Sequence, residues 1–285
     1  TYDYYRERFN RNSLDGQGGT IRAIVNLNVM NAFWSGSTKT MVFGNGFTRE
    51  IDISGHELTH GVTNSVGNGG ILDYEFQQGA LNESMSDIFG EMVEAWWKQG
   101  SPDWLKADPF DPTDRSKLLQ DYTNPNSVSS GLGPNPAKMS EFYQLPINQD
   151  QGGVHINSNI TNHCYYRLAV AMDGAIGLRD AEQIWYRALT TYLQKQSQFI
   201  DMRLAAKAAF DFVEIFDAPT SPPPAPVPSV NAPDSTLFFR WEPFSQAFFM
   251  GRREANLNDG INGVFLGTGD FPDFKRISVS GDGSF

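Results

Sequence analysis

The spacing of apolar residues along the chain predicts helices over much of its length. Apolar positions recur every three or four residues in five ranges, namely 52–66, 76–98, 157–172, 179–194 and 199–216. The clearest apolar face lies in the second range and consists of Leu81, Met85, Ile88, Phe89, Met92 and Val93. We expect the helix at 76–98 to bury this face in a core.

The pattern differs before residue 50 and between residues 100 and 153. The polar, aromatic start TYDYYRERFNRNS predicts a helix, and the runs Thr20–Leu27 and Thr40–Phe43 favour strands of a small sheet. Residues 100–153 are rich in Pro, Asn, Asp and Gly without a clear period, which predicts long loops. The order of elements is therefore mixed α/β first and mainly helical later, an α+β fold.

Composition divides the chain into four ranges. Residues 1–66 form a predicted N-terminal α/β lobe that ends in a helix, and residues 67–218 form a mainly helical lobe. Residues 219–236 (PTSPPPAPVPSVNAPDST) have the composition of a semi-rigid linker. Residues 237–285 are a C-terminal extension rich in aromatic residues and Gly, and nothing in its sequence indicates its role.

The charge balance narrows the possible partners. The chain carries 33 acidic and 22 basic residues, a net charge of −11, which argues against nucleic acid or an anionic membrane as its main partner. No apolar run approaches the roughly 18 residues that span a bilayer. The single cysteine, Cys164, excludes an internal disulfide and is expected to be a buried, unreactive thiol.

Candidate chemistry centres on the sequence HELTH, which holds two of the four histidines of the chain. On a helix, His56 and His60 lie on the same face and can bind one metal ion, and Glu57 lies beside that point. The chance of this motif on composition is on the order of one in a hundred or less. In the competing interpretation, Ser54 and Glu57 form a capping box and the histidines line a surface stripe.

A catalytic zinc site takes three protein ligands and leaves a fourth position open. Glu83 can supply the third ligand from the next helix, and Asp87 lies on the same face one turn later. Asp87 is placed to hold the second ring nitrogen of a liganding histidine. Alternatively, both are solvated acids that the helix dipole favours in a first turn.

Three motifs in order resemble the thermolysin family of zinc endopeptidases: HELTHGVT, then Tyr74 ahead of NESMSD, then Asp150-Gln-Gly-Gly-Val-His155-Ile-Asn-Ser. The resemblance begins at the N-terminus and extends to about residue 215. It implies a two-lobed zinc protease with a reduced N-terminal lobe and the active-site cleft between the lobes.

The resemblance implies that His56, His60 and Glu83 bind one catalytic zinc ion, and that Glu57 is the general base for the zinc-bound water. By the same matching, Tyr74 and His155 donate hydrogen bonds to the oxyanion of the tetrahedral intermediate.

The remaining matches concern orientation and substrate. Asp150 would orient His155, while Asn31 and Ala32 would hold the substrate backbone as an added strand. Ile53 and Leu119 match positions of the specificity pocket, which implies cleavage before bulky hydrophobic residues.

One position departs from the family pattern. The family usually has an arginine that binds the scissile carbonyl, and the matching segment Leu119–Pro125 has Gln120 there. A second register, on Asn135, places Gly131 at that position, so neither register restores the arginine. Losing an arginine guanidinium, which can donate two charged hydrogen bonds at once, costs about 2 to 4 kcal/mol of transition-state binding.

The resemblance also implies structural calcium. Asp52, Glu94, Asp103 and Asp108 match carboxylates of the family's calcium cluster, and a hard cation needs several oxygen ligands. Leu105 stands where a further glutamate is usual, so one calcium ion is better supported than two.

Two functions therefore compete. The first is a secreted zinc endopeptidase that acts on peptides and proteins. The second is a zinc-binding but catalytically weak homologue that binds peptides or a partner, because Gln120 replaces the arginine. A third, another family with the HExxH motif such as an aminopeptidase, fits the NESMSD and GGVHINS segments poorly. The sequence gives no indication of oligomeric state.

Overall fold

The structure is a computed structural model that describes residues 1–67, 69–106, 118–172, 174–216, 235–242 and 247–254. The chain divides into two compact units, Thr1–Ala206 and Lys207–Phe285. All the predicted site residues that the structure describes belong to the first unit. None of the helices in the described ranges is long and apolar enough to cross a membrane.

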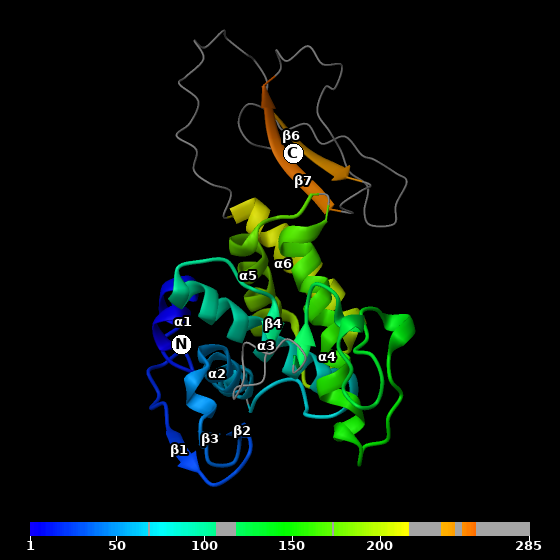
Figure 1. The fold of residues 1–285 in the computed structure, drawn as a ribbon. Coiled ribbons are helices and arrows are strands. Elements are labelled where there is room, and N and C mark those ends of the chain that lie inside the picture. The colour runs from blue at the N-terminus through cyan, green and yellow to red at the C-terminus, as the bar shows by residue number, and fades with distance from the viewer. Residues whose placement is uncertain (68, 107–117, 173, 217–234, 243–246, 255–285) are drawn as a thin grey trace. The chain divides into compact units, whose positions relative to one another are not determined.

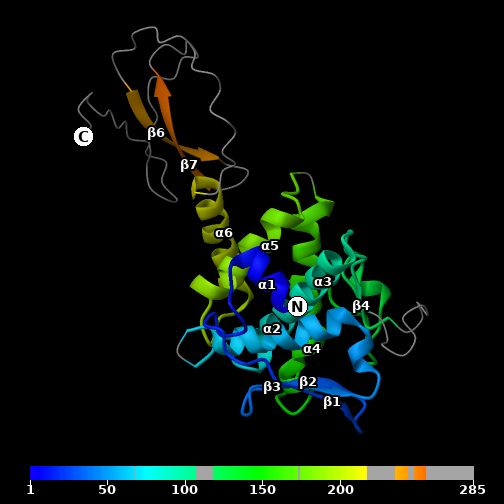
Figure 2. The same cartoon turned by 90° about the vertical axis from the view of Figure 1, so that its left-hand side faces the viewer.

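The N-terminal part of the first unit holds a small sheet and two helices. Its elements are α1 (Tyr2–Phe9), β1 (Ala23–Leu27), β2 (Ala32–Ser35), β3 (Thr40–Gly44), a 3-10 helix (Phe47–Arg49) and α2 (Ile51–Ser65). The central strand β3 pairs in parallel with β1 and antiparallel with β2, and every residue of β3 is buried. Figure 2 shows this sheet along α2, with which β2 and β3 are in contact.

The remaining part of the unit is mainly helical, as the sequence predicts. Its helices are α3 (Phe76–Lys98), α4 (Asp150–Tyr166), α5 (Leu178–Arg187) and the start of α6 (Phe199–Phe216), with π-helical turns at Arg167–Ala171 and Ala188–Tyr192 (Figure 1). In the part of 100–149 that the structure describes, the predicted long loops contain short elements. These are the paired strands β4 (Leu105–Lys106) and β5 (Gln120–Asp121) and 3-10 helices at Pro125–Ser127 and Met139–Glu141.

Helix α3 lies at the centre of the unit. The predicted apolar face is buried, with exposed fractions of at most 3%. Burial continues around the helix, however, because α2 and α4 both pack on it. Four acidic residues of α3 are therefore buried as well, at spacings of four, four and three that place them on one side of the helix: Glu83, Asp87, Glu91 and Glu94.

Helices α2 and α3 run side by side and approach each other very closely (Figure 1). A Cβ atom at Gly90 would stand 2.6 Å from the carbonyl oxygen of Asp52, and one at Gly55 would stand 2.8 Å from the Cα of Gly90. This contact line, from Asp52 and Glu94 at one end to His60 and Glu83 at the other, is called here the α2–α3 seam. Glycine at both positions lets the two backbones come this close.

The structure excludes one competing interpretation and corrects one prediction. Helix α2 begins at Ile51 with Glu50 as its N-cap residue, so Ser54 and Glu57 lie inside the helix and do not form the alternative capping box. Cys164 is exposed, not buried, because it lies on the outer side of α4 while its neighbour Tyr165 faces the core.

The second unit contains an antiparallel hairpin, β6 (Ser235–Glu242) and β7 (Ala247–Glu254), in register from Ser235 opposite Glu254 to Glu242 opposite Ala247. The hairpin falls mostly within the predicted extension 237–285. Nearly all of the predicted linker 219–236 lies outside the described residues.

The close approach at the seam gives a test of the packing. Gly90→Ala should lower the free energy of unfolding by about 1 to 3 kcal/mol, because the added methyl group collides with the backbone of α2. In an open helix position the same change would stabilise the protein by about 1 kcal/mol, so the sign of the effect is diagnostic. Denaturant unfolding measures it. The control is Gly100→Ala, whose new Cβ would have its nearest neighbour at 3.9 Å, and equal stability of the two variants would refute the tight seam.

Candidate active site

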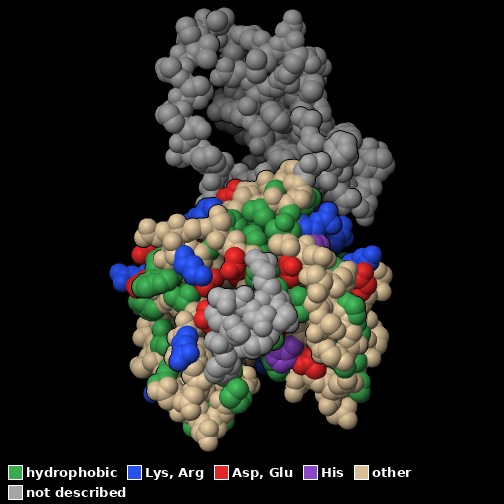
Figure 3. All heavy atoms as spheres, viewed as in Figure 1, with side chains coloured by type: hydrophobic (Ala, Val, Ile, Leu, Met, Phe, Trp, Pro, Cys, Tyr) green, Lys and Arg blue, Asp and Glu red, His purple; other side chains and the backbone are tan. Residues whose placement is uncertain are grey.

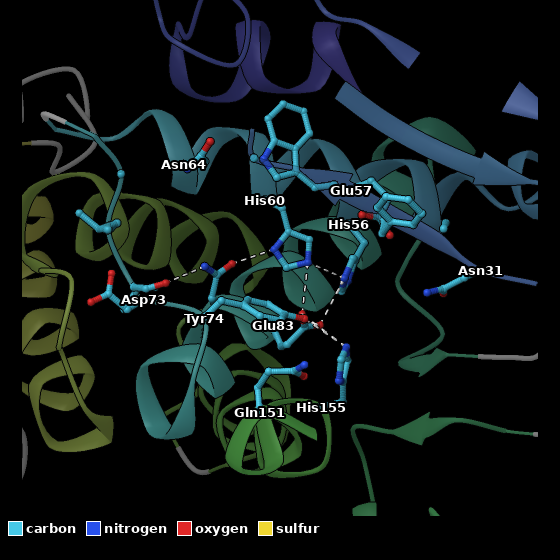
Figure 4. Close-up of a pocket in the computed structure, with 18 of the residues that line it drawn as sticks. Asn31, His56, Glu57, His60, Asn64, Asp73, Tyr74, Glu83, Gln151 and His155 are labelled. Carbon is cyan, nitrogen blue, oxygen red and sulfur yellow. Dashed lines mark hydrogen bonds and ion pairs between the residues drawn. The ribbon is translucent and has the colours of Figure 1, made fainter. Parts of the chain in front are cut away.

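Three side chains from α2 and α3 converge at one end of the seam (Figure 4). The Nε2 atoms of His56 and His60 are 3.0 Å apart. Glu83 places Oε2 at 3.4 Å from Nε2 of His56 and Oε1 at 3.4 Å from Nε2 of His60. The three ligand atoms therefore face a common point, and all three residues can bind one metal ion.

These distances fit zinc. Ligand atoms that surround a tetrahedral zinc ion at 2.0 to 2.2 Å stand roughly 3.3 Å from one another. In this site the two histidine nitrogens are 3.0 Å apart, and each of them lies 3.4 Å from one of the two carboxylate oxygens of Glu83. Two imidazoles and one carboxylate also form the donor set of catalytic zinc sites, which leave a fourth position free.

The second nitrogen of each histidine is held by α3. Nδ1 of His56 lies 3.0 Å from Oδ1 of Asp87, and Nδ1 of His60 lies 2.8 Å from Oδ1 of Asn82. Such partners fix the ring and leave Nε2 for the metal. The sequence predicted Asp87 but missed Asn82. The need of His60 for a partner, together with the position of Asn82 next to Glu83, was the signal that could have identified it.

The charges around His56 make metal binding compete with protonation. Burial and Lys106 lower the pKa of His56, but hydrogen bonds to Asp87 and Glu83 outweigh them and raise it to about 9. For Asp87, burial opposes ionisation, yet Lys106 and His56 hold the pKa of this carboxyl well below its usual range. A cation that binds His56 near neutral pH therefore displaces a proton.

Glu57 lies beside the metal ligands on α2. Its side chain is buried, and Oε2 has no hydrogen-bond partner within the described ranges. A buried carboxylate oxygen without a partner is costly, and such groups cluster at functional sites. Glu57 lines a cavity of about 520 Å³ together with His56, His60 and Glu83. Figure 3 shows a histidine side chain and nearby acidic side chains in a hollow on this face.

Tyr74 and His155 reach the same cavity from the helical part of the unit. The hydroxyl of Tyr74 donates a hydrogen bond to Oε1 of Glu83 and lies 3.2 Å from Nε2 of His155. Asp150 holds His155 from behind: its Oδ1 is 2.5 Å from Nδ1 of the ring, and its Oδ2 accepts the backbone N–H of His155. The arrangement leaves Nε2 of His155 on the cavity side (Figure 4).

A left-handed turn positions His155. Residues 150–153 all have positive φ angles and form this turn, and the right-handed part of α4 begins directly after them. Gly152 and Gly153 adopt this conformation readily, but Asp150 (φ 51°) and Gln151 (φ 46°) do so at a cost. A Cβ at Gly152 would stand 2.3 Å from the ring of Phe76, so the turn is also packed tightly against the start of α3.

The opposite wall of the cavity is formed by the start of β2 and includes Asn31 and Ala32. The carbonyl of Asn31 accepts a hydrogen bond from the N–H of Gly44 on β3 at 2.8 Å. Successive carbonyls of a strand point in opposite directions, so that of Ala32 points away from β3. In the described part of the chain, β2 has no strand on that outer edge.

Three predicted substrate-binding residues lie elsewhere. Ile53, Leu119 and Gln120 are not among the described residues that line this cavity. Leu119 is half exposed, whereas Gln120 is buried behind the site and accepts a hydrogen bond from Nδ2 of Asn162 at 3.1 Å. Their roles stay predictions.

Acidic groups gather at the other end of the seam. Carboxylate oxygens of Glu50, Asp52 and Glu94 lie within 4.8 Å of one another, as do those of Glu91, Glu94 and Asp103. The sequence predicted three of these residues and missed Glu50 and Glu91. The predicted ligand Asp108 lies outside the described residues.

Ionisation is disfavoured at two residues of this cluster, Asp52 and Glu91. Burial and the charge of Glu94 raise the pKa of Asp52 to about 6. Burial raises the pKa of Glu91 to about 8, against the opposing hydrogen bond from the N–H of Trp104. A divalent cation would relieve this repulsion, since carboxylate oxygens are its preferred ligands.

Comparison with known families agrees with the geometry. Residues 1–64 match the catalytic domain of the thermolysin metallopeptidases, and residues 70–213 match their alpha-helical domain. The chain belongs to the thermolysin metallopeptidase family. The family prediction and the predicted fold, a small mixed α/β portion followed by a helical domain, are confirmed.

Similar proteins include several bacterial proteases. Protease PrtS of Photorhabdus sp. (strain Az29) is 36% identical over 75% of this chain, and bacillolysin of Brevibacillus brevis is 40% identical over 72% of it. The chain spans 61% and 39% of the length of these two relatives. The solved precursor of protealysin, a metalloproteinase from Serratia proteamaculans, has a TM-score of 0.63 at 34% identity, covering 74% of this chain and 69% of that one.

The acidic cluster generates a prediction about pH. Asp52 and Glu91 have higher pKa values in the folded protein than in the unfolded chain, so their stabilising effect is present at low pH and is lost as the pH rises through about 6 and about 8. In chelator, the free energy of unfolding should therefore fall by a few kcal/mol between about pH 5 and about pH 8. Calcium should offset this fall, mostly near the upper end, where the carboxylates are ionised.

Thermal or denaturant unfolding at several pH values measures the effect. The matched variant is Glu91→Gln, whose side-chain oxygen can still accept the hydrogen bond from Trp104 but which does not titrate. In chelator, the free energy of unfolding of this variant should fall less between about pH 5 and about pH 8 than that of the wild type. Calcium should also raise it less. If the free energy of unfolding depends on pH in the variant as it does in the wild type, Glu91 is not the group responsible.

Proposed function

We propose that this chain is a zinc-dependent endopeptidase, in which His56, His60 and Glu83 hold the metal and Glu57 is the general base. The observation that supports this most is the buried carboxylate oxygen of Glu57, which has no partner among the described residues and lies in the cavity beside the metal ligands. Zinc bound there would supply a Lewis acid that acidifies water and polarises a carbonyl group.

Glu57 accepts the proton of the attacking water and delivers it to the leaving amine. Its position next to His56 on α2 places it at the edge of the metal site rather than among the ligands. General base catalysis of this kind contributes about 10²- to 10⁴-fold to the rate.

Tyr74 and His155 donate hydrogen bonds to the oxyanion that forms on the substrate. Partial burial and the charge of Glu83 raise the pKa of Tyr74, so its hydroxyl stays protonated and can donate. Burial lowers the pKa of His155, but Glu83 and Asp150 outweigh this effect and raise it, which favours a proton on the ring. Asp150 orients the ring through Nδ1.

The substrate is a peptide segment in extended conformation. The outer edge of β2 supports this, because the carbonyl of Ala32 points away from β3 at the cavity wall and can accept a backbone N–H. The exposed side chain of Asn31 stands next to it. Cleavage before bulky hydrophobic residues follows from the family match of Ile53 and Leu119.

Calcium is the proposed second ion. Asp52, Glu94 and Asp103 supply carboxylates, and Glu50 and Glu91 add two that bring the cluster nearer to the six to eight oxygen ligands that calcium takes. Among similar proteins, one from Staphylococcus epidermidis is named extracellular elastase, 37% identical over 74% of this chain. By that likeness we propose an extracellular site of action, where calcium is abundant.

A catalytically weak peptide-binding homologue is the second candidate. Gln120 favours it, because a neutral amide occupies the position where the family usually has an arginine. Glu57, Tyr74 and His155 line one cavity, and Asp150 holds the ring of His155; this combination favours the active enzyme.

The general base can be tested directly. Glu57→Gln should bind zinc as the wild type does but lose about 10²- to 10⁴-fold in the cleavage rate of an unstructured protein, because the amide cannot accept the proton. The measurement combines zinc content with initial rates, with and without chelator. Equal rates for the zinc-loaded wild type and Glu57→Gln would refute the proposed activity.

Tyr74→Phe tests the oxyanion donor. It should lower kcat by about 10²- to 10³-fold and change KM little, because the hydroxyl acts on charge that develops only in the transition state. The matched control is Tyr143→Phe, which removes a hydroxyl that donates to the carbonyl of Pro134 and whose residue does not line the cavity. If both variants keep the wild-type kcat, Tyr74 is not the donor.

A further inference from the structure

Lys106 lies behind the metal site, at a position to which the family resemblance assigns no role. Its Nζ is 2.5 Å from Oδ1 of Asp87 and 3.4 Å from Nδ1 of His56. The side chain is only 21% exposed. Lys106 is not among the described residues that line the cavity.

Asp87 needs this cation. Its side chain is completely buried, and a buried carboxylate is stable only when it is paired and hydrogen-bonded. Oδ2 accepts hydrogen bonds from Nδ2 of Asn162 at 2.9 Å and from Oγ of Ser158 at 3.4 Å, which are both neutral groups. Within the described part of the chain, Lys106 is the one Lys or Arg that pairs with Asp87.

Gln120 contacts the same network without a charge. Its Oε1 accepts a hydrogen bond from Asn162, and its Nε2 donates to Ser158 at 3.5 Å. Gln120 and Lys106 are also direct partners in the pairing of β5 with β4. The positive charge beside Asp87 therefore comes from β4, directly across from the amide on β5.

We propose that Lys106 is a positioning residue of the metal site. Its hydrogen bond to Oδ1 of Asp87 holds this carboxylate against Nδ1 of His56 and so keeps Nε2 directed at the metal. This inference rests on the proposed zinc site. Without Lys106, the partners that remain to Asp87 among the described residues are the neutral groups of Ser158 and Asn162 and the ring of His56.

The test measures zinc affinity by competition with a chelator, together with peptide cleavage. Lys106→Gln should raise the zinc Kd by about 10- to 100-fold, the usual effect of losing a group that supports a ligand. With saturating zinc, KM should stay near the wild-type value, because Lys106 does not line the cavity. The control is Lys138→Gln, which removes an exposed lysine paired with Glu141 and should leave the zinc Kd unchanged.

Two rescue variants separate positioning from a purely structural ion pair. Lys106→Arg restores a cation on β4, and the double variant Lys106→Gln/Gln120→Arg places one on β5, opposite the original position. Either should return the zinc Kd toward the wild-type value. In the wild-type background, Gln120→Arg should change the zinc Kd little, because Lys106 already pairs with Asp87.

A wild-type zinc Kd in folded Lys106→Gln overturns the proposal, as does failure of both arginine variants to restore the affinity. If Lys106→Gln does not fold, the zinc Kd values of Lys106→Arg and of the double variant are compared with that of the wild type. Values near the wild type support the proposal, and much weaker binding by both variants overturns it. The readout is independent of catalysis. A wild type that binds zinc tightly but cleaves no faster than Glu57→Gln would refute the proposed protease activity while the zinc measurements still test Lys106.

Discussion

The structure depends on the charges buried along one side of α3. Glu83, Asp87, Glu91 and Glu94 lie at most 9% exposed, and a helix with four buried carboxylates is stable only if positive charge or protons balance them. The partners differ along the helix: His56 and His60 at Glu83, Lys106 at Asp87, and Lys98 at Glu94. The proposed metal site and the acidic cluster therefore have the same cause: at both ends of the seam, buried carboxylates of α3 need positive charge or protons.

Glycine at the seam makes this arrangement possible. Gly55 and Gly90 let α2 and α3 approach until their backbones touch, so histidines on one helix reach carboxylates on the other with short, direct contacts. The two helices run in opposite directions along the seam, which pairs His56 with Asp87 and brings His60 to Glu83 and Asn82. The close packing of α2 on α3 therefore determines the distances between the side chains of the site.

The sequence predicted the helices and the candidate metal ligands because both depend on short-range spacing. The helix at 76–98 was predicted with its observed bounds, and HELTH places two ligands one turn apart. The sequence alone missed four residues whose proposed roles depend on contacts between segments far apart in the chain: Lys106, Asn82, Glu50 and Glu91. A strand pair of two residues on each side has no detectable period, so the position of Lys106 opposite Gln120 required the structure.

The left-handed turn before His155 ties the proposed chemistry to local order. Asp150 and Gln151 hold a disfavoured conformation, at roughly 1 to 2 kcal/mol each, and the turn persists because Gly152 is packed on the ring of Phe76. Strained segments of this kind open more easily than the helices that surround them. On warming, the turn would relax and His155 would leave the cavity while α2 and α3 are still intact, so that inactivation precedes global melting.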